Sequence, residues 1–255
     1  MRFGCCVPPD QVEVLAPAGF DFCELPTAAL CPLEDDGAAL PALRALAALP
    51  LPIESFNMLI PASLPLLGPN ADRTVLRGYL RRAFGRMAQL GAQVAVLGSG
   101  RARRIPDGMP RVQALGQLAE VLALAGEEAA RAGVGLALEH LNRGECNVFT
   151  TLDECRAFVQ ERGLAGLGVL ADLHHLELEC EPFASVASAA PLLLHVHVAD
   201  GGRRAPGIGG YDYAGFMAAL HEIGYDRRIS AECTWENLAE QAAGALDFMR
   251  SSWRR

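Results

Sequence analysis

Eight short apolar runs alternate with stretches of helical spacing, and this alternation constrains the fold more than any other feature of the chain. Each run has the length and residue types of a buried β-strand. The predicted strands are Arg2–Val7, Phe20–Leu25, Ile53–Leu59, Gln93–Gly98, Val134–His140, Leu167–Leu173, Leu192–Ala199 and Arg228–Thr234. Such an alternation is typical of a parallel sheet covered by helices.

The stretches between the predicted strands carry helix signals. From Val75 to Leu90, apolar residues recur three and four positions apart, and Gly91 follows as a stop signal. Further helices are predicted at Leu115–Ala125, after a capping box of Thr151 and Glu154, at Asp212–Ile223 and at Glu236–Met249.

The number of repeats and the length of the chain together favour a closed barrel. Eight strand–helix repeats in 255 residues match the (β/α)₈ barrel, which reaches about 250 residues as one domain. We therefore predict an α/β fold in which residues 1–255 form a single-domain (β/α)₈ TIM barrel. The alternative is an open doubly wound sheet, but no GxGxxG turn follows the first predicted strand.

Ionisable residues lie at the ends of the last four predicted strands, where such barrels place their chemistry. They are Glu139, Asp172, His197 and Glu232. The steps between them are 33, 25 and 35 residues, and a βα unit of such a barrel has about 31. Because side chains alternate between the two faces of a strand, all four are expected to point into the barrel.

Three carboxylates and an imidazole in an apolar barrel cannot all stay charged and unpaired. A divalent cation resolves this conflict, and a carboxylate-rich set with one imidazole suits Mn²⁺, Mg²⁺ or Co²⁺ better than thiolate-type zinc. We predict one divalent metal ion. Mn²⁺ is the favoured ion, and Mg²⁺, Co²⁺ and Zn²⁺ are the alternatives.

The composition excludes several function classes. All 22 basic residues are arginine, so Schiff-base, Walker-A and pyridoxal-phosphate lysines are impossible. The net charge of −8 argues against a nucleic-acid partner. The eight cysteines form no CxxC pair, which indicates reduced thiols.

Neither a membrane span nor a secretion signal is predicted. No apolar run approaches the roughly 18 residues of a membrane helix, and the start MRFGCCVPPD lacks a signal-peptide pattern. We therefore expect a cytoplasmic protein with no membrane partner.

Four motifs resemble the xylose-isomerase-like sugar isomerases and epimerases, most closely the D-tagatose and D-psicose 3-epimerase type. EHLNRGE at 139–145 is similar to their ExLNRxE stretch, and DLHH at 172–175 is similar to their DxxH. HVHVADGGRRAPGIG at 195–209 is similar to their HxHxxxxxR followed by PGxG, and Glu232 completes the set.

The resemblance implies roles for individual residues. Glu139, Asp172, His197 and Glu232 would hold the metal, and Glu139 and Glu232 would also be the acid and base groups. The residues implied in substrate binding are Glu145, His175, Arg203, Asn142 and His195. The implied reaction removes a proton beside the ketose carbonyl and passes through an enediolate. The implied partner is a sugar or sugar phosphate, and a homodimer or homotetramer is expected.

Several alternatives stay open. On the same barrel, the chain could be a keto-inositol dehydratase or a hydroxypyruvate-type isomerase; endonuclease IV-like repair and non-catalytic sugar binding are less favoured. The loop 98–108 with Arg101, Arg103 and Arg104 would bind an anionic group or, as we favour, be structural. Glu24 would either reach the site or be structural, and His174 is expected to point outward.

Overall fold

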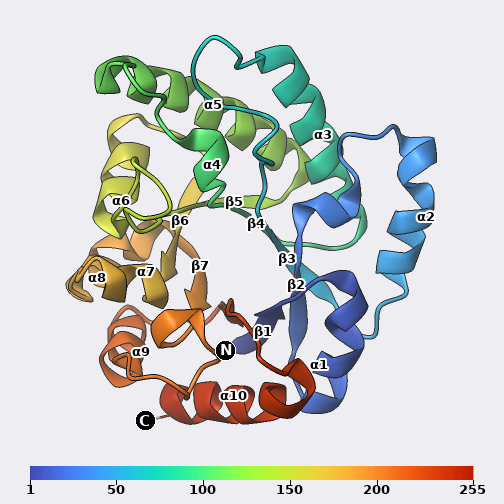
Figure 1. The fold of residues 1–255 in the computed structure, drawn as a ribbon, viewed down its shortest axis with the longest axis vertical. Coiled ribbons are helices and arrows are strands. Elements are labelled where there is room, and N and C mark those ends of the chain that lie inside the picture. The colour runs from blue at the N-terminus through green and yellow to red at the C-terminus, as the bar shows by residue number, and fades with distance from the viewer. Residues whose placement is uncertain (255) are drawn as a thin grey trace.

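The computed structural model describes residues 1–254, and within them eight parallel strands close into a barrel in sequential order, β1 to β8. Figure 1 shows the strands at the centre of the molecule and the helices around them. This architecture confirms the predicted TIM barrel. The strands are β1 (Arg2–Cys6), β2 (Phe22–Pro26), β3 (Ile53–Asn57), β4 (Val94–Leu97), β5 (Gly135–Glu139), β6 (Leu167–Asp172), β7 (Leu193–Val198) and β8 (Arg228–Ala231).

Helices follow the strands and form the outer layer (Figure 1). The α-helices are α1 (Val12–Ala18), α2 (Asp36–Ala47), α3 (Arg73–Gln89), α4 (Gly100–Arg103), α5 (Arg111–Ala132), α6 (Leu152–Glu161), α7 (Leu173–Leu178), α8 (Ala184–Ala189), α9 (Tyr213–Glu222) and α10 (Leu238–Trp253). Short 3₁₀ turns lie at η1 (Pro9–Gln11), η2 (Thr27–Leu30), η3 (Ala190–Leu192) and η4 (Gly201–Arg203).

Local sequence accounts for several helix ends. The Thr151 side chain accepts a hydrogen bond from the backbone N–H of Glu154 at the start of α6, as the capping box predicts. The carboxylate of Glu154 accepts instead from the backbone of Thr150, one residue earlier than the standard box. Helix α5 ends at Gly133, whose φ of 72° is the left-handed conformation that glycine adopts without penalty.

The predicted last strand is too long at its C-terminal end. Strand β8 ends at Ala231, three residues before the predicted Thr234. The backbone N–H of Glu232 still donates to Val198 of β7, but that of Thr234 donates to the carbonyl of Arg203 in the β7–α9 loop. The chain therefore leaves the sheet at Glu232 and turns toward the loops above the barrel.

The barrel interior contains an apolar cluster, and ion pairs lie at the N-terminal ends of the strands. Side chains of β4, β5 and β6 fill the interior, and the buried set is Val94, Val96, Ala137 and Leu170. At the N-terminal ends of the strands, the buried carboxylate of Glu54 pairs with Arg2 at 2.5 Å and with Arg228 at 3.3 Å. These ion pairs therefore lie at the end of the barrel opposite the C-terminal ends of the strands.

None of the helices in the described part of the chain, residues 1–254, combines the length and the apolar character required to cross a membrane.

Candidate metal and sugar site

Strands β5 to β8 bring the four predicted ligands together. Glu139 and Asp172 are the last residues of β5 and β6, His197 lies in β7, and Glu232 directly follows β8. Asp172 is the register partner of His197, so the two lie at the same level of the barrel. Ligand atoms of all four residues lie within 4.8 Å of one another. The parity prediction for these residues is therefore consistent with the structure.

The imidazole of His197 stands between two of the carboxylates. Its Nδ1 lies 3.3 Å from Oε1 of Glu139 and 3.2 Å from Oε2 of Glu232. The guanidinium of Arg203 bridges the other side of the cluster, because it donates to Asp172 at 2.7 Å and also to Glu232. Two basic side chains thus face three buried or half-buried carboxylates.

The surroundings separate the pKa values of the carboxyl groups. Burial and the neighbouring charge of Glu232 raise the pKa of Glu139 above its usual value. Burial acts in the same direction on Glu232 and Asp172, but the charges of Arg203 and His197 and the hydrogen bonds to these carboxylates together outweigh it and lower the pKa of both. A pair of carboxyls with pKa values shifted in opposite directions is typical of groups that divide the roles of acid and base.

The donor set fits a divalent cation. Three carboxylates and one imidazole nitrogen are hard or borderline ligands of the kind that Mn²⁺, Mg²⁺ and Co²⁺ accept. Space at the cluster depends on Gly98, which follows β4. A Cβ atom at this position would lie 2.2 Å from Oε2 of Glu139. The glycine therefore leaves room for the carboxylate in its present position.

Three of the predicted substrate-binding residues form a connected group beside the cluster. The side-chain amide of Asn142 donates to Glu145 at 2.7 Å, and its backbone N–H donates to Nδ1 of His175 at 3.3 Å. Because Nδ1 of His175 accepts, Nε2 carries the hydrogen. This buried Nε2–H has no hydrogen-bond partner among residues 1–254 and lies 3.4 Å from Asp172. It is a free donor at the edge of the cluster.

The two remaining predicted residues differ in their surroundings. Arg203 lines the cleft and contacts the cluster directly. His195 is fully buried, and its Nε2 donates to Oε2 of Glu24 at 2.7 Å. A contact between His195 and a substrate stays a prediction, while its observed contact is to Glu24 in the barrel interior.

Two histidines acquire contacts that the sequence patterns did not indicate. His140 is fully buried, and its Nε2 accepts a hydrogen bond from the backbone N–H of Asp172 at 3.2 Å. Burial lowers the pKa of His140 to about 3, so the ring is neutral. The outward orientation expected for His174 is wrong, because one of its ring nitrogens lies within 4.8 Å of ligand atoms of Glu145 and His175. The alternation of a strand stops at Asp172, which caps α7, and so does not extend to residue 174.

A cleft of about 1000 Å³ opens above the cluster. Glu139, Glu145, Arg203 and Glu232 line its polar end. The loops after β2 and β3 supply a mostly apolar wall, made of Pro26, Ala28, Cys31, Pro32, Leu33, Met58, Ile60, Pro61 and Ala62. The cleft therefore joins a charged end to an apolar end.

The arginines of the 98–108 loop divide between structure and surface. Arg103 is fully buried and donates to the carbonyls of Leu97 and Phe149, which ties the end of β4 to the loop after β5. Arg101 and Arg104 line the cleft, and Arg104 also donates to the carbonyl of Glu145. Arg103 is thus excluded from direct binding of an anionic group.

Comparison with known proteins adds a family and relatives. The family model described as "Xylose isomerase-like TIM barrel" matches residues 12–252. A ketose 3-epimerase of Arthrobacter globiformis is 31% identical over 141 residues, which are 53% of this chain and 49% of that protein. A 3-dehydroshikimate dehydratase of Pseudomonas aeruginosa is 28% identical over 265 residues, 95% of this chain but 39% of that protein. The matches thus span about half or less of these relatives.

The fold has close structural neighbours. A crystal structure of D-psicose 3-epimerase in the presence of D-fructose superposes with a TM-score of 0.86 at 21% identity, and the match covers 99% of both chains. At this identity the likeness shows the fold alone.

Proposed function

Because this chain belongs to the xylose isomerase-like TIM barrel family, we propose that it is a metal-dependent epimerase or isomerase that acts on a ketose or a ketose phosphate. The observation that carries the proposal is the cluster of Glu139, Asp172, His197 and Glu232 at the polar end of the cleft. The ketose 3-epimerase among its relatives supports this substrate class.

Glu139 and Glu232 would move the proton. One carboxylate takes the proton from the carbon beside the ketone, and the C–H electron pair enters a carbon–carbon double bond as the carbonyl oxygen gains negative charge. The other carboxyl then donates a proton to the opposite face of that carbon, which inverts its configuration. Both side chains line the same cleft, and the chain contains no lysine to do this work.

The metal would be held by the same four residues, Glu139, Asp172, His197 and Glu232. A bound Mn²⁺, Mg²⁺, Co²⁺ or Zn²⁺ ion would act as a Lewis acid that stabilises negative charge on the substrate oxygens. Mn²⁺ is our first choice because carboxylates dominate the ligand set.

Polar side chains around the cluster would orient the sugar. Arg203 lines the cleft and would donate to a substrate oxygen. His175 is fully buried beside Asp172, and its Nε2–H would be a second donor only to a sugar that reaches the edge of the cluster. Glu145 lines the cleft and can accept from a hydroxyl, while Asn142 holds both Glu145 and His175 in place. Together these residues would fix which carbon of the ketose faces the two carboxyls.

Proton exchange at a defined carbon tests this proposal. The protein reconstituted with Mn²⁺ is incubated in D₂O with a panel of ketoses and ketose phosphates, and NMR locates the exchanged carbon. We expect deuterium at one carbon beside the carbonyl, together with the product epimer or isomer. Absence of exchange across the panel, in a folded and Mn²⁺-loaded protein, would overturn the proposal.

A dehydratase is the second candidate, because the relative that matches 95% of this chain is named a 3-dehydroshikimate dehydratase. It would begin with the same proton removal but would expel a hydroxyl group instead of returning the proton. Incubation with 3-dehydroshikimate or a keto-inositol distinguishes the two, because dehydration creates an ultraviolet-absorbing conjugated product and epimerisation does not.

A further inference from the structure

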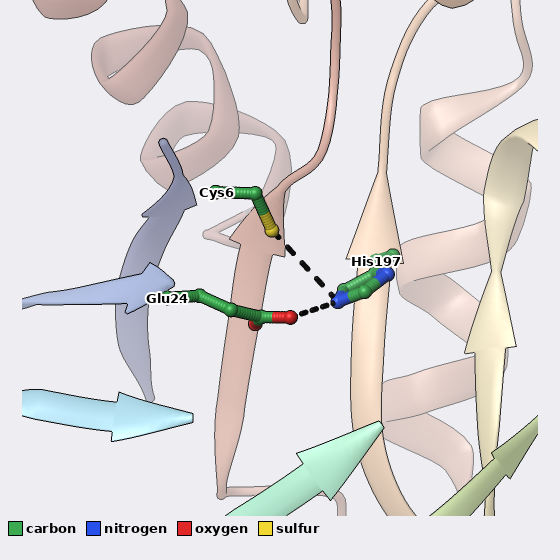
Figure 2. Close-up of side chains that lie close together, drawn as sticks. All are labelled: Cys6, Glu24 and His197. Carbon is green, nitrogen blue, oxygen red and sulfur yellow. Dashed lines mark hydrogen bonds and ion pairs between the residues drawn. The ribbon is translucent and has the colours of Figure 1, made fainter. Parts of the chain in front are cut away.

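A buried carboxylate from β2 lies directly beneath the candidate metal cluster. Glu24 is fully buried, and four side chains donate to it. Its Oε2 accepts from Ser55 at 2.7 Å, from Ser230 at 2.8 Å and from His195 at 2.7 Å. Its Oε1 accepts from Nε2 of His197 at 2.8 Å (Figure 2). The carboxylate is thus fixed at one oxygen and contacts a candidate ligand with the other.

This contact determines which nitrogen of His197 can bind a metal. A carboxylate only accepts hydrogen bonds, so Nε2 of His197 carries a hydrogen. Nδ1 lies on the other side of the ring, 3.3 Å from Oε1 of Glu139 and 3.2 Å from Oε2 of Glu232. A cation bound between these carboxylates would therefore take the lone pair of Nδ1, in place of a proton there. In metal sites, a ligating histidine almost always donates its other N–H to an acceptor such as a carboxylate, which fixes the ring orientation.

We propose that Glu24 is the positioning residue that holds His197 with Nδ1 directed toward the metal. The inference rests on the proposed function, because it assumes that the cluster of Glu139, Asp172, His197 and Glu232 binds a divalent cation. Glu24 itself is not a ligand in this arrangement, and its effect on substrate turnover passes through His197.

A second metal site would be the competing interpretation of the same residues. The thiol sulfur of Cys6 lies 4.0 Å from Nε2 of His197, and Figure 2 shows Cys6, Glu24 and His197 directed toward one another. A cation between them would have to displace the hydrogen on Nε2. It would also compete with the donors that already occupy Glu24. The geometry therefore favours one ion per chain, and Cys6 is not expected to bind it.

Titration of the full-length chain with Mn²⁺ tests the role of Glu24. We compare the dissociation constant and the stoichiometry of the wild type with those of Glu24→Gln, Glu24→Asp and Cys6→Ala, after circular dichroism has established that each variant is folded. We expect about a 10- to 100-fold weaker Mn²⁺ affinity for Glu24→Gln, a smaller loss for Glu24→Asp, and one ion per chain throughout. Cys6→Ala, as the matched control, should bind Mn²⁺ like the wild type.

Two results would overturn the proposal. A folded Glu24→Gln variant with wild-type Mn²⁺ affinity would show that Glu24 does not position His197. A wild type with two ions per chain, one of them lost in both Glu24→Gln and Cys6→Ala, would show that Glu24 is a ligand of a second ion. A wild type that binds no Mn²⁺ would refute the proposed metal dependence itself, so the two failures are distinguishable.

A measurement on the unmutated chain covers the case in which the Glu24 variants do not fold. ¹⁵N NMR of histidine-labelled protein loaded with diamagnetic Mg²⁺ or Zn²⁺ reports which ring nitrogen of His197 carries the hydrogen, with the signal assigned from its absence in His197→Gln. A hydrogen on Nε2 is the expected result. A hydrogen on Nδ1 would overturn the proposal.

Discussion

The two halves of the barrel contribute differently to the cleft. Strands β5 to β8 carry the four candidate ligands at their C-terminal ends. Strands β1 to β4 and their loops carry the apolar wall, the supporting carboxylate of Glu24 and the small residue Gly98. The first half supplies none of the four candidate ligands. The positions of Glu139 and His197 in the second half nevertheless depend on it, through the space at Gly98 and the hydrogen bond to Glu24.

The largest effect is expected from the two proposed acid and base groups in the second half. Glu139→Gln and Glu232→Gln should each lower kcat by about 10²–10⁴-fold, because a general acid or base contributes that much. The measurement is the steady-state rate on the ketose identified by the exchange experiment. Glu34→Gln, a carboxylate that lines the same cleft from the first half, is the matched control and should keep its rate. An equal fall of kcat in all three variants would contradict the proposal that the acid and base groups lie only in the second half.

Gly98→Ala tests whether the first half shapes the second. The added Cβ would lie 2.2 Å from Oε2 of Glu139, so this carboxylate has to move. We expect kcat to fall by about 10²-fold, since small misplacements of a reacting group cost about that much. Gly85→Ala, where a Cβ meets no atom of the described chain within 4 Å, is the control and should keep the wild-type rate. A wild-type rate for Gly98→Ala would contradict the dependence between the halves.

The sequence patterns predicted the parts of the fold and site that depend on local periodicity. The eight strands were placed within about three residues of their ends, and the spacing and parity of Glu139, Asp172, His197 and Glu232 located the cluster. The metal and the substrate roles stay predictions.

The remaining contacts depend on distances across the barrel, which periodicity does not encode. Glu24 and His197 are 173 positions apart and lie on strands that are not neighbours in the sheet. The requirement that a buried carboxylate finds donors is the signal that could have paired Glu24 with the two histidines of β7. Gly98 gave no signal, because its role is the space it leaves for Glu139.

Glu128, a carboxylate in the outer layer of helices, has a pKa shifted in the opposite direction from that of Glu139. Glu128 of α5 is buried and contacts Arg77 and Arg131 at 2.9 Å each. Burial would raise the pKa of Glu128, but hydrogen bonds from Arg81 and Arg77 outweigh it and lower the pKa. Where the pKa of Glu139 is raised at the site, that of Glu128 is lowered, as expected of a group that stabilises the fold.

The stability contributed by Glu128 should therefore depend on pH. A carboxyl whose pKa is lowered by folding stabilises the protein above its unfolded pKa of about 4.3, and this stabilisation is lost as pH falls through the folded value. Because the three arginines are largely exposed, Glu128→Gln should lower the free energy of unfolding by only about 1 kcal/mol at pH 7, and its difference from the wild type should shrink below about pH 4. Urea unfolding at both pH values measures this. A difference that is independent of pH would show that the ion pairs contribute nothing.

The smallest effect is expected from the arginines at the rim. Arg104 donates to a backbone carbonyl and lines the cleft, so we expect Arg104→Ala and Arg101→Ala to change kcat/KM by less than about fivefold on a ketose and on its phosphate alike. A selective loss on the phosphate would show instead that the first half also recognises charge. Arg103→Ala is unsuitable here because Arg103 is buried and structural.

The hydrogen bond between Glu24 and His197 has a consequence for recombination. Its two ends lie in opposite halves of the chain, so any crossover placed between β2 and β7 separates them. A chimaera can take its first strands from one parent and its last strands from another. It keeps this hydrogen bond only when both parents carry the same acceptor and the same donor. Where one parent has an apolar residue opposite the histidine, the hybrid barrel inherits an imidazole whose Nε2 has lost its buried acceptor.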